Sequence, residues 1–318
     1  MRAILTVFFF LTKRKLVFIN SPLQFICCVE YLTKFKDNHN TLFVGYAKKF
    51  TIRSIKAVEN FYKNKKIKFK VIYLDEILNI YFFHFILNVR KYFLFKFDSV
   101  IVGDYRYYLH RKIISISNKK IFVDDGFGSL FFNKFFPKKI QNSIFFTTYP
   151  LNYNVNKVIE NNFDYLKDLY KFKKKSKGTI FILPGLSQKS IMTKNQYFNW
   201  ILNIKKKIKG TLTLVPHRHE INLIMKSKIL KKKFSLKINY LPIELSLLKF
   251  DFLPETIVHN YSSCSITLNK ILGKKTKILN YQNKYLENTI DHYSRGGKPN
   301  DTMLPMKKFY KKNKLKSL

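Results

Sequence analysis

Short apolar segments alternate with longer segments of helical character along the first half of the chain. The apolar segments are rich in β-branched and aromatic residues, which predicts strands at residues 16–20, 41–46, 67–74, 99–104, 119–126 and 143–149. Strands that alternate with helices are typical of a parallel sheet covered by helices on both faces. The first half is therefore predicted to be a Rossmann-like α/β domain.

The same alternation restarts after residues 152–177, a stretch rich in asparagine, tyrosine and lysine. It predicts further strands at residues 178–185, 211–217, 234–241, 255–260 and 275–281. Because 318 residues exceed what one hydrophobic core usually organises, we predict two domains, residues 1–170 and 171–318. Ligands of such sheets bind at the carboxyl ends of the strands, so we expect a binding cleft between the two domains.

The charge of the chain is strongly positive, with 60 lysines and arginines against 19 acidic residues and a formal net charge of +41. Such a charge favours anionic partners, which leaves nucleic acid, anionic membrane and phosphorylated substrates open. The lysines are spread through every segment and no nucleic-acid-binding motif accompanies them, so we favour a general compositional bias and predict no nucleic-acid partner.

Three cysteines, two of them adjacent, imply no disulfide framework and fit a reducing, cytoplasmic setting. The apolar segment at residues 3–11 is too short to span a bilayer. Residues 307–318 carry six lysines and are expected to be solvated or to contact an anionic inner-membrane surface. We therefore predict a cytoplasmic protein with peripheral membrane contact and no transmembrane helix.

The first candidate site is the sequence Asp124-Asp125-Gly126 with Gly128, directly after a predicted strand. Two interpretations are open. Asp-Gly is a common turn pair, which favours a surface turn. Alternatively, the aspartates stand at the carboxyl end of the fifth strand, where the glycines allow a ligand to approach closely.

A second candidate is His217, which follows a predicted strand and Pro216. A histidine there can act as a general acid or donate a hydrogen bond to a phosphate, and the alternative is a polar loop residue. His217 and His219 could form a metal pair, but no third ligand is placed beside them, so we predict no metal site.

Ser262 and Ser263 precede a predicted amphipathic helix that closes at Gly273, so each is a candidate N-cap. The same helix N-terminus is alternatively a phosphate site. Glu244 stands just after Pro242 at another helix start, where a carboxylate either stabilises the helix dipole or binds the hydroxyls of a ribose.

In this order, Asp124-Asp125-Gly126, Pro216-His217, Glu244 and Ser262-Ser263 resemble the motifs of the bacterial sialyltransferases. Residues 19–25, INSPLQF, are similar to the opening of the lipooligosaccharide sialyltransferases of glycosyltransferase family 52. One motif departs from the family pattern, because the usual His-Pro pair is replaced here by His217-Arg218 with the proline before the histidine.

This resemblance implies a GT-B fold and transfer of sialic acid from CMP-sialic acid to a glycan hydroxyl with inversion, without metal or other cofactor. It implies Asp124 as the base, with Asp125 raising its basicity, and His217 as the donor to the leaving phosphate. Ser262 and Ser263 would bind that phosphate and Glu244 the ribose. No Asp-x-Asp motif occurs in the chain. The alternatives are a transferase of another activated sugar and a basic protein that binds nucleic acid or anionic lipid.

Overall fold

The computed structural model describes residues 14–36, 41–46, 49–65, 71–73, 84, 87–88, 97–103, 108–126, 128–171, 174–175, 178–185, 192–208, 210–218, 220–238, 240–260 and 262–281. Residues 307–318, for which membrane contact is predicted, lie outside these ranges, as do residues 3–11 and His219. Within the ranges, no helix combines the length and apolar character that crossing a membrane requires. The chain divides into two compact units, Met1–Leu166 and Lys167–Leu318.

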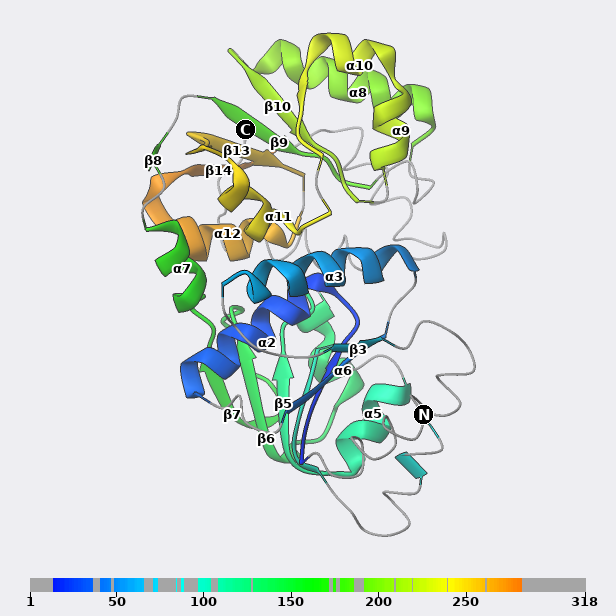
Figure 1. Ribbon diagram of the computed structural model, residues 1–318, viewed down its shortest axis with the longest axis vertical. Helices are drawn as coiled ribbons and strands as arrows, with labels where there is room; N and C mark the ends of the chain where they lie inside the picture. Colours follow the sequence, from blue (N-terminus) through cyan, green and yellow to red (C-terminus); the bar gives the residue numbers. More distant parts are fainter. Residues whose placement is uncertain are drawn as a thin grey trace. The chain divides into compact units, whose positions relative to one another are not determined.

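The described residues of the first unit form a seven-stranded sheet with the order β3-β2-β1-β4-β5-β6-β7 (Figure 1). All neighbouring strands are parallel. The order reverses direction between β1 and β4, which creates a topological switch point at the carboxyl ends of these strands. The strands are β1 (Lys15–Ile19), β2 (Thr41–Gly45), β3 (Val71–Tyr73), β4 (Phe97–Val102), β5 (Ser117–Val123), β6 (Ile140–Thr147) and β7 (Val155–Glu160).

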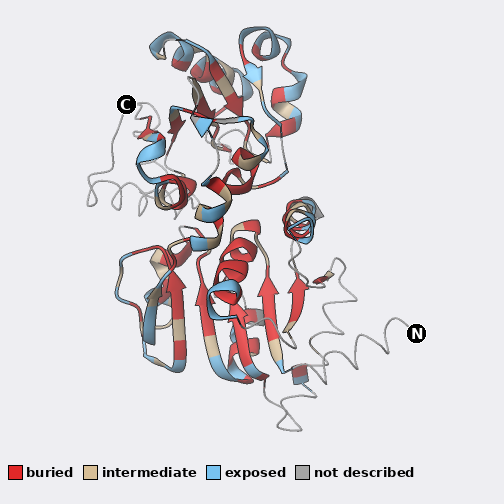
Figure 2. Ribbon diagram, turned by 60° about the vertical axis from the view of Figure 1, so that its left-hand side comes forward, coloured by how far each residue is buried: buried red, intermediate tan, exposed pale blue. Residues whose placement is uncertain are grey.

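Burial in this sheet increases toward the carboxyl ends of β5 and β6, whose first halves contain exposed residues and whose last residues are fully covered (Figure 2). Phe122 and Phe145 pack there against Phe132 with ring centroids 4.8 and 4.9 Å away. The helical segments of the unit are α2 (Pro22–Phe35), α3 (Lys49–Lys63), α5 (Tyr108–Ser115), η1 (Gly128–Phe131), α6 (Phe132–Phe135) and the start of α7 (Asp164–Tyr170).

Helix α2 has clear start and stop signals in the sequence. The hydroxyl oxygen of Ser21 accepts a hydrogen bond from the Gln24 backbone N–H at 3.2 Å, and Pro22 occupies the first turn. Lys36 ends the helix in the left-handed conformation. Serine at the N-cap and proline in the first turn are favoured for these reasons, so the sequence Ser-Pro fixes where the helix begins.

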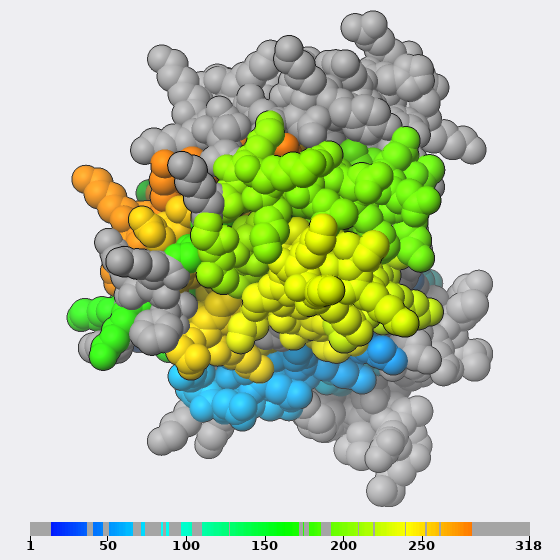
Figure 3. All heavy atoms as spheres, turned by 90° about the horizontal axis from the view of Figure 1, so that it is seen from above, coloured from blue at the N-terminus to red at the C-terminus, as the bar shows by residue number. Residues whose placement is uncertain are grey.

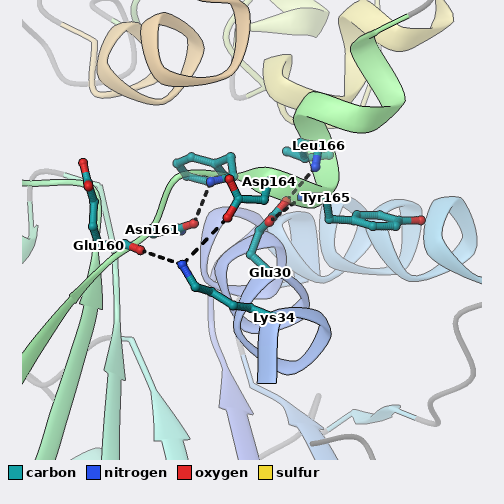
Figure 4. A network of polar contacts seen from close by, with 8 residues as sticks. Glu30, Lys34, Glu160, Asn161, Asp164, Tyr165 and Leu166 are labelled. Atoms are coloured by element: carbon teal, nitrogen blue, oxygen red, sulfur yellow. Dashed lines mark hydrogen bonds and ion pairs between the residues drawn. The ribbon is translucent and has the colours of Figure 1, made fainter. Parts of the chain in front are cut away.

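The segment that closes the first unit is held by Glu30, a buried carboxylate in the middle of α2 (Figure 4). Its oxygens accept hydrogen bonds from the backbone N–H groups of Tyr165 at 3.1 Å and Leu166 at 2.9 Å, both in the first turn of α7. Lys34, one turn further along α2, donates to the Glu160 carbonyl at 3.5 Å. Glu30 thus caps α7 from another helix and satisfies donors that the helix itself leaves open.

In the second unit, the described residues form a five-stranded parallel sheet in the order β11-β10-β9-β13-β14. Its strands are β9 (Thr179–Ile182), β10 (Leu212–Val215), β11 (Ser235–Leu236), β13 (Thr256–His259) and β14 (Lys277–Asn280), and β8 (Lys174–Lys175) pairs separately with β12 (Phe252–Leu253). The helical segments are α8 (Lys194–Lys207), α9 (Ile221–Lys226), α10 (Lys228–Lys233), α11 (Ile243–Ser246), η2 (Leu247–Lys249), α12 (Cys264–Leu272) and η3 (Gly273–Lys275).

The prediction of two Rossmann-like α/β units is confirmed, because each unit is built on its own parallel sheet with helices in the crossovers. The two compact units divide between Leu166 and Lys167, inside α7, and the predicted domains 1–170 and 171–318 stay a prediction. The facing of the two sheets across a cleft stays a prediction.

Two edge strands depart from the predicted pattern. Strand β7 lies within residues 152–177, which we interpreted as a break, and β11 keeps only two residues of the predicted 234–241. Both are edge strands with exposed polar positions, so they lack the apolar continuity of central strands.

Candidate active site at the carboxyl ends of the strands

Asp124 follows β5 and is completely buried. Its Oδ1 accepts hydrogen bonds from the hydroxyls of Thr147 at 2.6 Å and Ser129 at 3.0 Å, and its Oδ2 accepts from the Thr148 backbone N–H at 2.7 Å. Burial raises the pKa of Asp124 to about 6, and these three hydrogen bonds oppose the rise. The sequence reasoning attributed a raised basicity to repulsion from Asp125, whereas burial is the main cause.

Asp125 has a different environment, since it is only half-buried. Its Oδ1 accepts hydrogen bonds from the Gln24 side-chain amide at 2.8 Å and from the Ser21 hydroxyl at 3.2 Å. Both donors belong to the start of α2, where the helix dipole also favours a negative charge. Asp125 is therefore the carboxylate of the pair that solvent reaches, and the start of α2 fixes its position.

Gln24 connects three strand ends at the switch point. Its Oε1 accepts from the Asn20 N–H, directly after β1, at 2.8 Å, while its Nε2 donates to Asp125, after β5. Gly103 follows β4, and a Cβ built there would lie 2.2 Å from Gln24 Cγ. Only a residue without a side chain leaves room for Gln24 at this position.

The two loop glycines have separate reasons for being glycine. Gly126 has a φ of 57°, the left-handed conformation that side chains disfavour. A Cβ on Gly128 would lie 3.1 Å from Oδ2 of Asp125. The Asp-Asp-Gly segment therefore forms a tight turn that holds the Asp124 carboxylate inside the fold and the Asp125 carboxylate at its surface.

In the second unit, His217 lies two residues after β10 and is half-buried. A Cβ on Gly185, which follows β9, would lie 2.9 Å from His217 Nδ1. The backbone N–H of Glu220 donates to the His217 carbonyl at 2.7 Å and closes the loop. The imidazole therefore lies at the carboxyl ends of two adjacent strands, where it was predicted.

The serine pair lies at the start of α12, but the hydroxyl of Ser263, the N-cap residue, does not make the capping bond that the sequence suggested. Ser263 occupies the N-cap position with helical backbone angles and makes no side-chain capping bond. The Ser262 hydroxyl instead lies 2.9 Å from Cys264 Sγ, and its backbone N–H donates to His259 Nδ1 at 3.4 Å. Burial lowers the pKa of His259 to about 3, so this imidazole is neutral and acts as an acceptor.

Glu244 lies in the first turn of α11 and is buried. Its Oε1 accepts from the Thr267 hydroxyl of α12 at 2.5 Å, and its carbonyl accepts from the Tyr170 hydroxyl at 2.7 Å. Burial raises the pKa of the Glu244 carboxyl. Burial also raises the pKa of the Cys264 thiol, and the nearby Glu244 charge adds to that rise. Glu244, Cys264 and Ser262 therefore form one connected cluster around α12.

The sequence reasoning missed several residues that shape these sites: Gln24, Gly103, Ser129, Thr147, Thr148 and His259. Gln24 carried a signal, because Ser-x-x-Gln is the pattern of a capping box. The threonines carried none, since their contacts to Asp124 come from β6, more than 20 residues away. No group of three His, Cys, Asp or Glu side chains in the described ranges is arranged to hold a metal ion.

No protein-family model matches the chain, and no curated protein matches it either. Among solved structures, the crystal structure of the glycosyltransferase VinC in complex with DTDP matches over 96% of this chain and 96% of its own, with 9% identity and a TM-score of 0.39. Function is therefore inferred from the chain's own residues.

Proposed function

We propose that the protein is an inverting glycosyltransferase that moves sialic acid from CMP-sialic acid to a galactoside-type hydroxyl of a surface glycan. The observation that carries the proposal is the Asp124-Asp125 pair at the switch point of the first sheet, with one carboxylate buried and the other accessible. A simple surface turn needs neither three donors on a buried carboxylate nor a glutamine held between three strand ends.

The two aspartates have roles in our proposal that differ from those implied by the family resemblance. Asp124 has no exposed surface, so an incoming hydroxyl cannot reach it without opening the fold. Asp125 is accessible and is oriented by Gln24 and Ser21. We therefore assign Asp125 as the base, with Asp124 as the positioning residue that anchors the turn.

In the proposed reaction, Asp125 takes the proton of the acceptor hydroxyl as that oxygen attacks the anomeric carbon of sialic acid. The bond between this carbon and the CMP phosphate oxygen breaks, and the phosphate leaves with the electron pair. The configuration inverts in a single displacement through an oxocarbenium-like transition state. Asp125, which acts on the acceptor glycan, and His217, which acts on the CMP-sugar donor, belong to different units. The proposed reaction therefore requires residues of both units to contact the two substrates at the same time.

The second unit is proposed to hold the donor. His217 donates a hydrogen bond to the leaving phosphate, and Ser262, Ser263 and the N-terminal amides of α12 bind the same group. Glu244, for which the family resemblance implies a contact to the ribose, is buried and accepts a hydrogen bond from Thr267. We therefore assign it as a residue that positions α12 and not as a direct ribose contact. The strong positive charge of the chain favours both anionic groups of the donor. No metal or other cofactor takes part in the proposed reaction, in keeping with the family resemblance and the lack of an Asp-x-Asp motif.

The test is release of CMP from CMP-N-acetylneuraminic acid with a lactose acceptor, with and without EDTA. We expect acceptor-dependent release that EDTA does not change, and loss of release in Asp125→Asn and His217→Ala. Asp98→Asn removes an exposed carboxylate of the same unit and should keep full activity. Retained activity in Asp125→Asn would refute its role as the base, and loss in Asp124→Asn alone would return that role to Asp124.

A parallel panel of other nucleotide sugars separates the sialyltransferase proposal from a transferase of another sugar. Turnover of a different donor with the same dependence on Asp125 would keep the mechanism and replace the donor. Absence of turnover together with absence of CMP binding would refute the proposal and favour a protein that only binds anionic partners.

A further inference from the structure

Exposed apolar side chains gather in one segment of the second unit. Within the described ranges, six large hydrophobic side chains are exposed, and four of them lie between residues 225 and 240. They are Met225 at 38%, Ile229 at 57%, Ile238 at 36% and Tyr240 at 40% exposure. Single exposed hydrophobic residues are common, but four in one short segment make this segment a candidate for an interaction surface.

The local fold explains why Met225 and Ile229 point outward. Ser227 separates α9 from α10 and accepts a hydrogen bond from the Leu230 N–H at 3.3 Å. Ile224 and Leu230 are fully buried, so they occupy the core-facing positions of the two helices. Met225 and Ile229 are their direct sequence neighbours and therefore face away from the core.

Lysines alternate with these apolar residues along the sequence. Lysines 226, 228, 231, 232, 233 and 237 are all exposed, and no acidic residue occurs in residues 221–243. Lys205, in the basic last turn of α8, donates to the Lys233 carbonyl, which brings residues 205–207 beside the end of α10. Figure 3 shows α8 and the segment around α9 and α10 side by side on one face.

We propose that this basic apolar surface, residues 205–207 and 225–240, binds the headgroup region of an anionic lipid bilayer. The lysine ammonium groups contact lipid phosphates, while Met225 and Ile229 enter the boundary between headgroups and acyl chains. Lysine suits such a position because its stem stays in apolar surroundings while the charge reaches the phosphates.

Nucleic acid is the other anionic macromolecule, and the composition of the surface disfavours it. Single-stranded nucleic acid is usually bound by aromatic side chains on which bases stack. The exposed apolar side chains here are mostly aliphatic, with Tyr240 as the aromatic one among the four. The proposal goes beyond the proposed function and does not depend on it, because it concerns a different surface and needs no catalysis.

The test is co-sedimentation of the full chain with vesicles of phosphatidylcholine alone and vesicles containing phosphatidylglycerol. One variant changes Lys228, Lys231 and Lys232 to glutamate. Its matched control changes Lys274, Lys275 and Lys277, which are exposed at the opposite edge of the same sheet, to glutamate. Both triple variants alter the net charge equally, so their difference reports the surface and not the total charge.

We expect wild type to bind only the anionic vesicles, and the first triple variant to bind at least about tenfold more weakly than the control. Ile229→Gln, which leaves the charge unchanged, should also weaken binding. The proposal would be overturned if both triple variants weakened vesicle binding equally, or if Ile229→Gln left vesicle binding unchanged. Failure of wild type to bind vesicles while it binds a single-stranded RNA through the same lysines would overturn it in favour of nucleic acid.

Discussion

Replacement of Gly103 by alanine should displace Gln24 and release Asp125 from one of its two donors. The new Cβ would lie 2.2, 2.4 and 2.8 Å from three consecutive heavy atoms of the Gln24 side chain. Because these atoms include Cγ, a small rotation at the end of the side chain does not relieve the overlap. Gln24 is fully buried at the start of α2, so the side chain has to leave its position.

The cost follows from the interactions that Gln24 makes. Loss of its hydrogen bond to the half-buried Asp125 carboxylate costs about 1.5 kcal/mol, and loss of the bond from the Asn20 N–H costs about 1 kcal/mol. Residual overpacking adds roughly 1 kcal/mol. Gly103→Ala should therefore destabilise the first unit by about 3.5 kcal/mol.

A double-mutant cycle makes the prediction specific. Gln24→Ala removes every side-chain atom that overlaps the new Cβ, so adding Gly103→Ala to it should cost under about 0.5 kcal/mol. The free energy of unfolding is measured by urea titration with circular dichroism, and the fluorescence of the single tryptophan, Trp200, serves as a reference for the second unit. Additive costs for the two substitutions would refute the proposed contact between Gly103 and Gln24.

Three further predictions concern stability. Burial lowers the pKa of His259 to about 3, so below pH 6.5 the unfolded chain binds a proton that the folded chain excludes. The free energy of unfolding of the second unit should therefore keep its full value above pH 6.5 and fall by about 1.4 kcal/mol per pH unit between pH 6.5 and about 3. Urea titrations at several pH values should find this slope in wild type and not in His259→Gln. Glu30→Gln should lower the free energy of unfolding by about 2 kcal/mol because it weakens the cap of α7. Lys34→Met removes only a partly exposed ion pair and should change it by under about 0.5 kcal/mol. Equal effects of the two substitutions would contradict the role of Glu30 as the cap. Thr193→Ala should cost about 1 kcal/mol by breaking the capping box of α8, and Ser263→Ala should cost under about 0.5 kcal/mol because its hydroxyl makes no capping bond, as thermal unfolding of the two variants can check.

The difference between local and long-range information is clearest at Asp124 and Asp125. Their position after the fifth strand was predictable, because the apolar segment before them and the glycines after them are local signals. Their separate environments were not predictable. Asp124 accepts from Thr147 in β6, and Asp125 accepts from Gln24 at the start of α2, which is about 100 residues away in the sequence. The sequence therefore located the motif but did not indicate which of its two carboxylates is buried, and the role of each stays a proposal.

Local sequence signals account for the alternation of strands and helices, the two parallel sheets, the start of α2 and the glycine that ends α12. These features depend on side-chain periodicity and on backbone preferences within a few residues. Only the packing of each whole unit places β7 and β11 at the sheet edges, Gln24 against Gly103, and Thr267 against Glu244. Such contacts depend on which strands become neighbours in the sheet, and strand order is set by the packing of the whole unit and not by any short stretch of sequence.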